Sequence, residues 1–200
     1  MSSPRIALTF DTEHWSHPST PDVQDRILDV LAAAGVRATF FVQGRWATAY
    51  PECGRRIAAA GHLVGNHSHH HAPMDTLTDA GIESDVLKAQ EAIVAITGAD
   101  PRPWFRCPFG YGHADPRVLA ALDRSGYRNI HWDVEPDDWR PERTPADLER
   151  LVIGGALQHG DGAVVLLHSW PPATIAALPE ILSGLADTGA RMVGLDEVAA

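Results

Sequence analysis

A cluster of histidines in the first half of the chain is the densest group of side chains capable of metal chemistry. Five of the 11 histidines lie within the ten residues 62–71. His67 and His71 are four residues apart, which would place both rings on one face of a helical turn and let them bind a single ion. The alternative is a solvated polyhistidine stretch, but this stretch is internal and is interrupted by Ser68. The sequence assigns no role to the neighbouring histidines His14, His69 and His70.

Two acidic residues near the N-terminus are candidate partners for these histidines. Asp11 and Glu13 follow the apolar run 6–10, which is typical of a strand. Residues two apart on a strand point to the same face, so both carboxylates can reach one site while Thr12 points away. Two histidines and a carboxylate make a catalytic zinc site with one position left open for water. The alternative is that both acids lie exposed in a loop.

Three further segments carry reactive side chains, and none of them is specific by itself. Arg106 precedes a proline and a glycine, so a rigid turn could aim its guanidinium at a carboxylate; a surface ion pair is the alternative. Asp138 and Trp139 end a stretch of interleaved acids and tryptophans, and a tryptophan face suits a sugar ring, although core packing explains it as well. His168 ends an apolar strand, where a histidine is more often structural than catalytic.

Strands and helices alternate along the chain and must position these residues. Short β-rich runs predict strands at 6–10, 38–42, 63–65, 127–132, 163–167 and 191–193. Apolar residues at helical spacing predict helices at 23–34, 48–60, 78–97, 116–125, 145–158 and 174–187. Four of the helices are followed by glycine, at Gly35, Gly61, Gly98 and Gly126. The alternation predicts an α/β fold with parallel strands, either a barrel or an open doubly wound sheet.

The composition limits the class of protein and its partners. The chain has 200 residues, 44% hydrophobic and 21% charged, which predicts a single domain over residues 1–200. A net charge of -10 disfavours a nucleic-acid partner. We expect no membrane span and no signal peptide, and therefore a cytoplasmic protein, or an extracellular one if a leader has been removed. Cys53 and Cys107 make no disulfide framework, and the oligomeric state stays open.

Taken in order, these segments resemble the polysaccharide deacetylase family, carbohydrate esterase family 4, whose shared unit is the NodB homology domain. The most specific match is NHSHHH at 66–71, where the family has His-Ser/Thr-x-x-His after Gly-Asn. The other matches are ATFFV at 38–42, RCPFG at 106–110, DW at 138–139 and LLH at 166–168. The resemblance implies a distorted (β/α) barrel of about seven parallel strands, similar to an incomplete TIM barrel.

The first motif departs from the family pattern. The family opens with Thr-Phe-Asp-Asp-Gly, in which the first Asp is the base and the second binds the metal, whereas this chain has Thr-Phe-Asp-Thr-Glu at 9–13. Asp11 keeps the place of the base, Thr12 replaces the metal-binding Asp, and Glu13 is the nearby substitute. Divergent relatives spread the two acids in this way, so the change is compatible with activity and leaves the substrate open. Cys107 for Pro and Phe109 for Tyr could also alter the pocket.

The resemblance implies a hydrolase that uses one divalent ion to remove an N-acetyl group from an amino sugar. We expect zinc, with cobalt or nickel as alternatives, held by Glu13, His67 and His71. Asp11 would take a proton from water, and Arg106 would orient this carboxylate and keep it charged.

The remaining roles concern the leaving group and the substrate. His168, kept protonated by Asp138, would donate a proton to the departing nitrogen. The family places an oxyanion-binding backbone N–H at Phe109. Trp139 and Leu166 would contact the acetylated sugar.

Three other functions stay open on the same residues. The site could hydrolyse another C–N bond, in a formamide, a cyclic imide or a ureide, or it could remove O-acetyl groups from sugars of the xylan type. A metal-binding and sugar-binding module without turnover is the third. Such a module usually lacks the acid or the base, and here Asp11 and His168 are both present.

Overall fold

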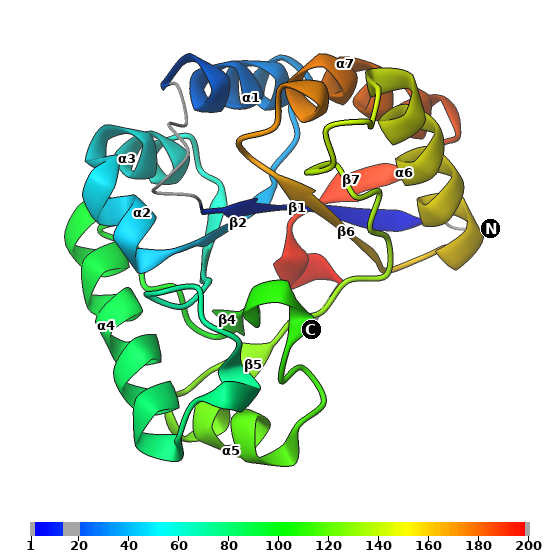
Figure 1. The fold of residues 1–200 in the computed structure, drawn as a ribbon. Helices are drawn as coiled ribbons and strands as arrows, with labels where there is room; N and C mark the ends of the chain where they lie inside the picture. The colour runs from blue at the N-terminus through cyan, green and yellow to red at the C-terminus, as the bar shows by residue number, and fades with distance from the viewer. Residues whose placement is uncertain (1–2, 14–20, 199–200) are drawn as a thin grey trace.

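The strands of the protein form one sheet in which every pairing is parallel. The computed structural model describes residues 3–13 and 21–198, and within them seven strands follow the order β5-β4-β3-β2-β1-β6, with β7 paired to β1. The strands are β1 (Arg5–Thr12), β2 (Thr39–Val42), β3 (Leu63–Asn66), β4 (Trp104–Phe105), β5 (Arg128–Asn129), β6 (Ala163–His168) and β7 (Arg191–Val193). Helices surround this curved sheet, as Figure 1 shows. The predicted distorted (β/α) barrel is confirmed.

The helices follow the strands in the expected alternation. They are α1 (Pro21–Ala33), α2 (Gly44–Ala49), α3 (Pro51–Ala59), α4 (Asp79–Thr97), α5 (Pro116–Arg124), α6 (Pro145–His159) and α7 (Pro172–Asp187). Short 3-10 turns lie at η1 (Met74–Thr76), η2 (Pro108–Gly110) and η3 (Leu195–Glu197). Among the described residues, none of the helices combines the length and the apolar character that crossing a bilayer requires.

An irregular segment joins the two ends of the sheet. β5 pairs with β4 at one end, and a few residues later Val134 forms a parallel bridge with Val165 of β6 at the other. The amide of Leu166 donates to the carbonyl of Val134 at 2.9 Å, which extends this contact. The barrel is therefore closed by loop backbone on this side rather than by a regular strand, which explains why it is distorted.

Successive side chains of the central strand β1 point alternately toward the helix layer and into the barrel interior. Ile6, Leu8 and Phe10 belong to the large hydrophobic cluster that packs under the helices. Ala7 belongs to a separate interior cluster that includes Phe41. Because strand side chains alternate, Thr9, Asp11 and Glu13 follow Ala7 on the interior side. The polar end of the strand therefore lies inside the barrel, at the carboxyl ends of its neighbours.

Local sequence signals set most helix boundaries as expected. Thr78 accepts a hydrogen bond from the Gly81 amide at the start of α4, and Gly98 ends this helix with a φ of 70° that suits glycine. Thr144 and Asp147 form a capping box at the start of α6. The other three predicted terminal glycines also have positive φ: Gly35, Gly61 and Gly126.

Two element predictions need correction. The single helix predicted at 48–60 is wrong, because α2 ends before Tyr50 and α3 begins at Pro51. A proline removes one amide donor and disfavours helical backbone in the residue before it, and Tyr50 has φ -127° and ψ 61°. The strand predicted at 127–132 is only Arg128–Asn129, since the chain then turns toward β6.

We predict that Gly65→Ala destabilises the barrel. A Cβ atom at this position would lie 2.7 Å from the Phe41 ring and 3.3 Å from Cβ of Trp104. Overpacking of this kind lowers the free energy of unfolding by about 1–3 kcal/mol, measurable by urea denaturation. Gly154→Ala on α6 is the matched control, since nothing lies within 4 Å of its added Cβ. This control should gain about 0.5–1 kcal/mol from helix propensity. Equal effects of the two changes would show that the interior is not tightly packed at Gly65.

Candidate active site

A cavity of about 410 Å³ lies where the carboxyl ends of the strands meet. Its wall combines acids, histidines and aromatic rings from β1, β6 and the loops that follow β3, β4 and β5. The lining residues are Asp11, Glu13, His67, His71, Phe109, Trp132, Glu135, Trp139, Leu166, His168 and Trp170. Most of the residues singled out from the sequence are therefore brought to one place.

Arg106 lies in the barrel interior and contacts Asp11 from below the cavity. The guanidinium is fully buried, and its Nη1 donates to Oδ1 of Asp11 and to Oγ1 of Thr9, both at 2.8 Å. Its Nε donates to the carbonyl of Ile130 at 3.2 Å, and its Cζ lies 4.1 Å from the centre of the Phe41 ring. Burial lowers the pKa of Arg106, although a guanidinium stays charged at any physiological pH. Arg106 contacts Asp11 through a single hydrogen bond, which orients the carboxylate as expected.

Glu13, His67 and His71 bring their potential ligand atoms within 4.8 Å of one another. Nε2 of His67 lies 3.4 Å from Oε2 of Glu13 and 3.1 Å from Nε2 of His71, and Glu13 also contacts His71. Nδ1 of His67 lies 3.0 Å from the carbonyl of Arg106, which can only accept, so Nδ1 carries the proton. In the neutral ring Nε2 then presents its lone pair to Glu13 and His71, which together with His67 form the Glu-His-His trio. One carboxylate and two imidazole nitrogens in this state fit a divalent ion.

The segment from His67 to His71 is not the helical turn that the four-residue spacing suggested. Ser68 and His71 have positive φ, 63° and 58°, so the backbone departs from a right-handed helix at both residues, and the two rings still come together. Asp85 on α4 accepts the amides of His69 and His70 at 2.7 and 3.2 Å. Nδ1 of His70 also lies 2.6 Å from Oδ1 of Asp85, so this ring stabilises the loop and does not join Glu13, His67 and His71. His14 lies outside the described residues.

His168 is held by a buried carboxylate on the side away from the cavity. Its Nδ1 donates to Oδ1 of Asp138 at 2.7 Å, and its amide donates to Oδ2 at 2.7 Å. Thr174, in the first turn of α7, donates to the same Oδ2 at 2.6 Å. Burial alone lowers the pKa of His168, but the charge and hydrogen bond of Asp138 outweigh it and raise the pKa to about 9. The ring is therefore a cation near neutral pH, with Nε2 3.8 Å from Glu13.

The predicted substrate contacts also line the cavity. Phe109 is 61% exposed and has a φ of 57°, a strained backbone for an aromatic residue, and its ring contacts His71 with centroids 4.4 Å apart. Trp139 is half-exposed at the rim, whereas Leu166 is buried in the wall.

The sequence interpretation missed several residues of the site. Trp170 lines the cavity two positions after His168, and Trp132 lines it together with its hydrogen-bond partner Glu135. Trp170 adjoins a predicted segment, whereas Trp132 and Glu135 lie within the stretch of interleaved acids and tryptophans, in which only Asp138 and Trp139 were given a role. Thr174 and Asp85 carried no signal, because their partners are distant in sequence.

The chain belongs to the polysaccharide deacetylase family, whose sequence profile matches residues 1–130. A chitooligosaccharide deacetylase of Bradyrhizobium sp. (strain ANU 289) is 40% identical over 171 residues, which cover 84% of this chain and 72% of that protein. A family 4 carbohydrate esterase from Streptomyces lividans, solved in complex with acetate, has a TM-score of 0.83 at 30% identity, covering 96% of this chain and 93% of that one.

A pseudoenzyme is also among the similar structures. This protein, a CE4 family pseudoenzyme from Bacillus anthracis, has a TM-score of 0.88 at 29% identity, covering 99% of this chain and 66% of that one. A mutant of it is described as having restored enzymatic activity. Likeness of fold therefore does not by itself decide whether a member turns over substrate.

We predict that Arg106→Met lowers the free energy of unfolding by about 3–5 kcal/mol, because it leaves the Asp11 carboxylate buried without its cation. The same change in an Asp11→Asn background should cost less, since no buried charge is then stranded. Urea denaturation of the four proteins, in chelator so that bound metal does not contribute, gives the coupling energy. Equal costs in both backgrounds would mean that Arg106 stabilises the barrel by packing alone.

Proposed function

We propose that the protein is a metal-dependent hydrolase that removes the N-acetyl group from an amino sugar. The observation that carries this proposal is the convergence of three units on one cavity. A Glu-His-His trio lies beside a carboxylate paired with arginine and an imidazole paired with a second carboxylate. Hydrolysis of an amide needs a water nucleophile, charge stabilisation on the carbonyl oxygen and a proton for the nitrogen, and the three units match these needs.

Glu13, His67 and His71 would hold the ion, for which we propose zinc, with cobalt or nickel as alternatives. When bound, such an ion lowers the pKa of a water molecule toward about 7 and polarises the carbonyl group of the substrate. These three residues supply neutral nitrogen and anionic oxygen donors, and the carbonyl of Arg106 fixes the orientation of the His67 ring.

Asp11 is the proposed general base. Its Oδ1 is engaged by Arg106, while Oδ2 lies 3.4 Å from Nε2 of His67, on the side of the trio. The carboxylate can therefore accept a proton from water through Oδ2 while the guanidinium holds it in place. Because Arg106 cannot lose its own proton, it stays a cation while Asp11 takes up the proton and later releases it.

His168 is the proposed general acid. Asp138 accepts from Nδ1, so the remaining proton on the imidazolium sits on Nε2, the nitrogen that faces Glu13 and the cavity. A proton delivered from Nε2 to the amine nitrogen lets the acetyl group separate as acetate. The raised pKa keeps His168 protonated before this step.

Three residues are proposed to bind the substrate. The left-handed backbone at Phe109 supports a role for its N–H as a donor to the oxyanion, since strain of this kind persists where function requires it. Trp139 offers a half-exposed ring to a sugar, and Leu166 offers an apolar wall to the acetyl methyl group.

Acetate release tests the proposal directly. The metal-loaded protein should release acetate from N-acetylglucosamine oligomers. Acetylated xylan forms a second arm with the same readout, whereas formamides are followed by formate release, and cyclic imides and ureides by loss of the substrate. Turnover confined to one of those arms would replace the proposed substrate class.

A binding module without turnover is the second candidate, which the similarity to a pseudoenzyme favours. Against it, Asp11, Arg106, Asp138 and His168 are all present and paired in this chain. Oligosaccharide binding by the metal-loaded protein with no turnover in any arm would establish this candidate instead.

We predict that Glu13→Ala releases the metal while Thr12→Ala retains it. Glu13 is one of three protein ligands, so its loss should weaken metal affinity by more than about 100-fold, measured by metal analysis after mild chelation. Thr12 is the matched control, because it is buried beside Glu13 and its hydroxyl has no hydrogen-bond partner among the described residues.

Asp11→Asn separates the role of the base from that of the ligand. This variant should retain its metal and lose turnover, because an amide side chain cannot take a proton from water. Full metal retention by Glu13→Ala together with metal loss by Asp11→Asn would reverse the two assignments.

We predict that His168→Ala slows amide hydrolysis by about 10²- to 10⁴-fold and slows hydrolysis of an activated aryl ester much less. An aryloxide leaves without a proton, whereas an amine does not. His159→Ala, at a half-exposed histidine on α6, is the control and should keep both rates. Equal losses on the amide and the ester, at unchanged metal content, would show that His168 does not protonate the nitrogen.

A further inference from the structure

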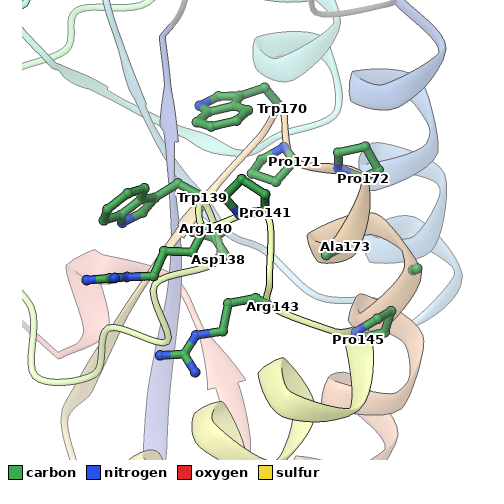
Figure 2. A pocket seen from close by; sticks show the side chains of 11 residues that line it. Asp138, Trp139, Arg140, Pro141, Arg143, Pro145, Trp170, Pro171, Pro172 and Ala173 are labelled. Atoms are coloured by element: carbon green, nitrogen blue, oxygen red, sulfur yellow. The ribbon is translucent and has the colours of Figure 1, made fainter.

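A second cavity lies beside the catalytic cavity and shares part of its wall. It has a volume of about 550 Å³ and is formed by the loop 138–145 and the chain at 170–176, where α7 begins. Trp139 and Trp170 line both cavities. Figure 2 shows both tryptophans at this cavity, together with Arg140 and Arg143 from the same loop as Trp139. A ligand larger than one sugar unit could therefore extend from one cavity into the other.

The charged residues in the wall of the second cavity are Arg140, Arg143 and Asp138. The carboxylate of Asp138 is buried, and both of its oxygens are occupied by His168 and Thr174. The arginine side chains are instead 44% and 29% exposed. The charge that this cavity presents to a ligand is therefore positive, although the chain as a whole carries a net charge of -10.

Asp137 holds the two guanidinium groups but offers one negative charge for two positive ones. Its Oδ2 lies 3.2 Å from Nε of Arg140 and 3.1 Å from Nη2 of Arg143. Glu142, with its side chain 69% exposed, approaches only Arg140, at 3.9 Å. Nε of Arg143 is buried and finds no hydrogen-bond partner among the described residues. Among the described residues Arg143 pairs only with Asp137, which it shares with Arg140, so the exposed part of its guanidinium is incompletely compensated and can meet an anion.

The rest of the wall suits a sugar ring and is rigid before binding. Cζ of Arg140 lies 4.8 Å from the centre of the Trp139 ring, a cation–π contact that favours this arrangement of the two side chains. Pro141, Pro145 and Pro171 also line the cavity, and proline restricts the backbone that carries them. A cavity that is already ordered loses less conformational entropy when a ligand binds.

We infer that this second cavity is a subsite for a carboxylate carried by the sugar unit next to the one that is deacetylated. Trp139 and Trp170 bind the faces of the neighbouring unit, and Arg143, supported by Arg140, binds its acidic group. The inference rests on the proposed function for the identity of the reacting unit. It adds that acidic oligosaccharides are preferred to neutral ones.

Three matched ligands test this subsite. The first is a neutral N-acetylglucosamine tetramer, the second is the same tetramer with 3-O-lactyl groups on alternate units, and the third is the methyl ester of the second. The ester has nearly the shape of the acid without its charge. An oligomer with a hexuronic acid as the neighbouring unit distinguishes the other source of a carboxylate.

Calorimetry with the metal-loaded protein should show the acid binding about tenfold more tightly than its ester, the effect of one hydrogen bond to a charged group. The preference should shrink at high salt, because Arg143 is partly exposed. Arg143→Gln should remove most of the preference. Arg150→Gln, at an exposed arginine of α6 outside the cavity wall, should leave it unchanged.

Each outcome decides one of the two proposals. Equal binding of acid and ester, or a preference that survives Arg143→Gln, overturns the subsite even if the protein deacetylates the neutral tetramer. A preference for the acid that Arg143→Gln abolishes supports the subsite even if no ligand releases acetate, and in that case only the proposed function fails. The ratio of kcat/KM for acid over ester gives a second readout and should follow the binding ratio.

Discussion

The buried guanidinium of Arg106 connects the parts of the barrel that form the site. It donates to Asp11 and Thr9 of β1 and to the carbonyl of Ile130 beyond β5, and it lies against Phe41 of β2. The carbonyl of the same residue accepts from the His67 ring. Removing such a cation from water costs several kcal/mol, which only well-placed acceptors offset. The interior is therefore arranged around one charge, and Asp11, the proposed base, and His67, a proposed metal ligand, take their positions from it.

The charges of the site follow from this arrangement. Two buried carboxylates, Asp11 and Glu13, approach His67, while Arg106 compensates only one of them. Asp138, on the other side of His168, keeps that imidazole protonated. A buried site with an excess of anionic groups attracts cations, whether a proton on His168 or a divalent ion at the trio. A base paired with an arginine and an acid paired with a carboxylate can thus coexist within one cavity.

The fold and the residues of the site carry different information about function. The fold is shared with a family 4 carbohydrate esterase and with a pseudoenzyme at similar TM-scores, so it does not discriminate between them. Discrimination must come from the residues of the cavity and its surroundings. This chain has Thr12 and Glu13 where the family pattern has Asp and Gly, and it has two arginines beside the catalytic cavity. These residues, rather than the barrel, bear on what the protein acts on.

The sequence by itself predicted the class of fold and the members of the trio, because both depend on short-range patterns. The side-chain alternation of a strand placed Asp11 and Glu13 on one side, and the alternation of strands and helices along the chain predicted a parallel sheet. The sequence did not predict the break between α2 and α3 at Tyr50, although Pro51 follows it, because the helical spacing of apolar residues continues across the break.

Only the tertiary structure decided how these residues are held. His67 and His71 meet through two left-handed residues and the carboxylate of Asp85, not through a helical turn. Thr174 reaches Asp138 from another element, and the arginines of the second cavity lie beside Trp170 only because the 138–145 loop packs against the start of α7. Contacts of this kind join residues that are far apart in the chain. Periodicity and spacing describe neighbours along the backbone. They do not predict these contacts, which form only when folding brings distant parts of the chain together.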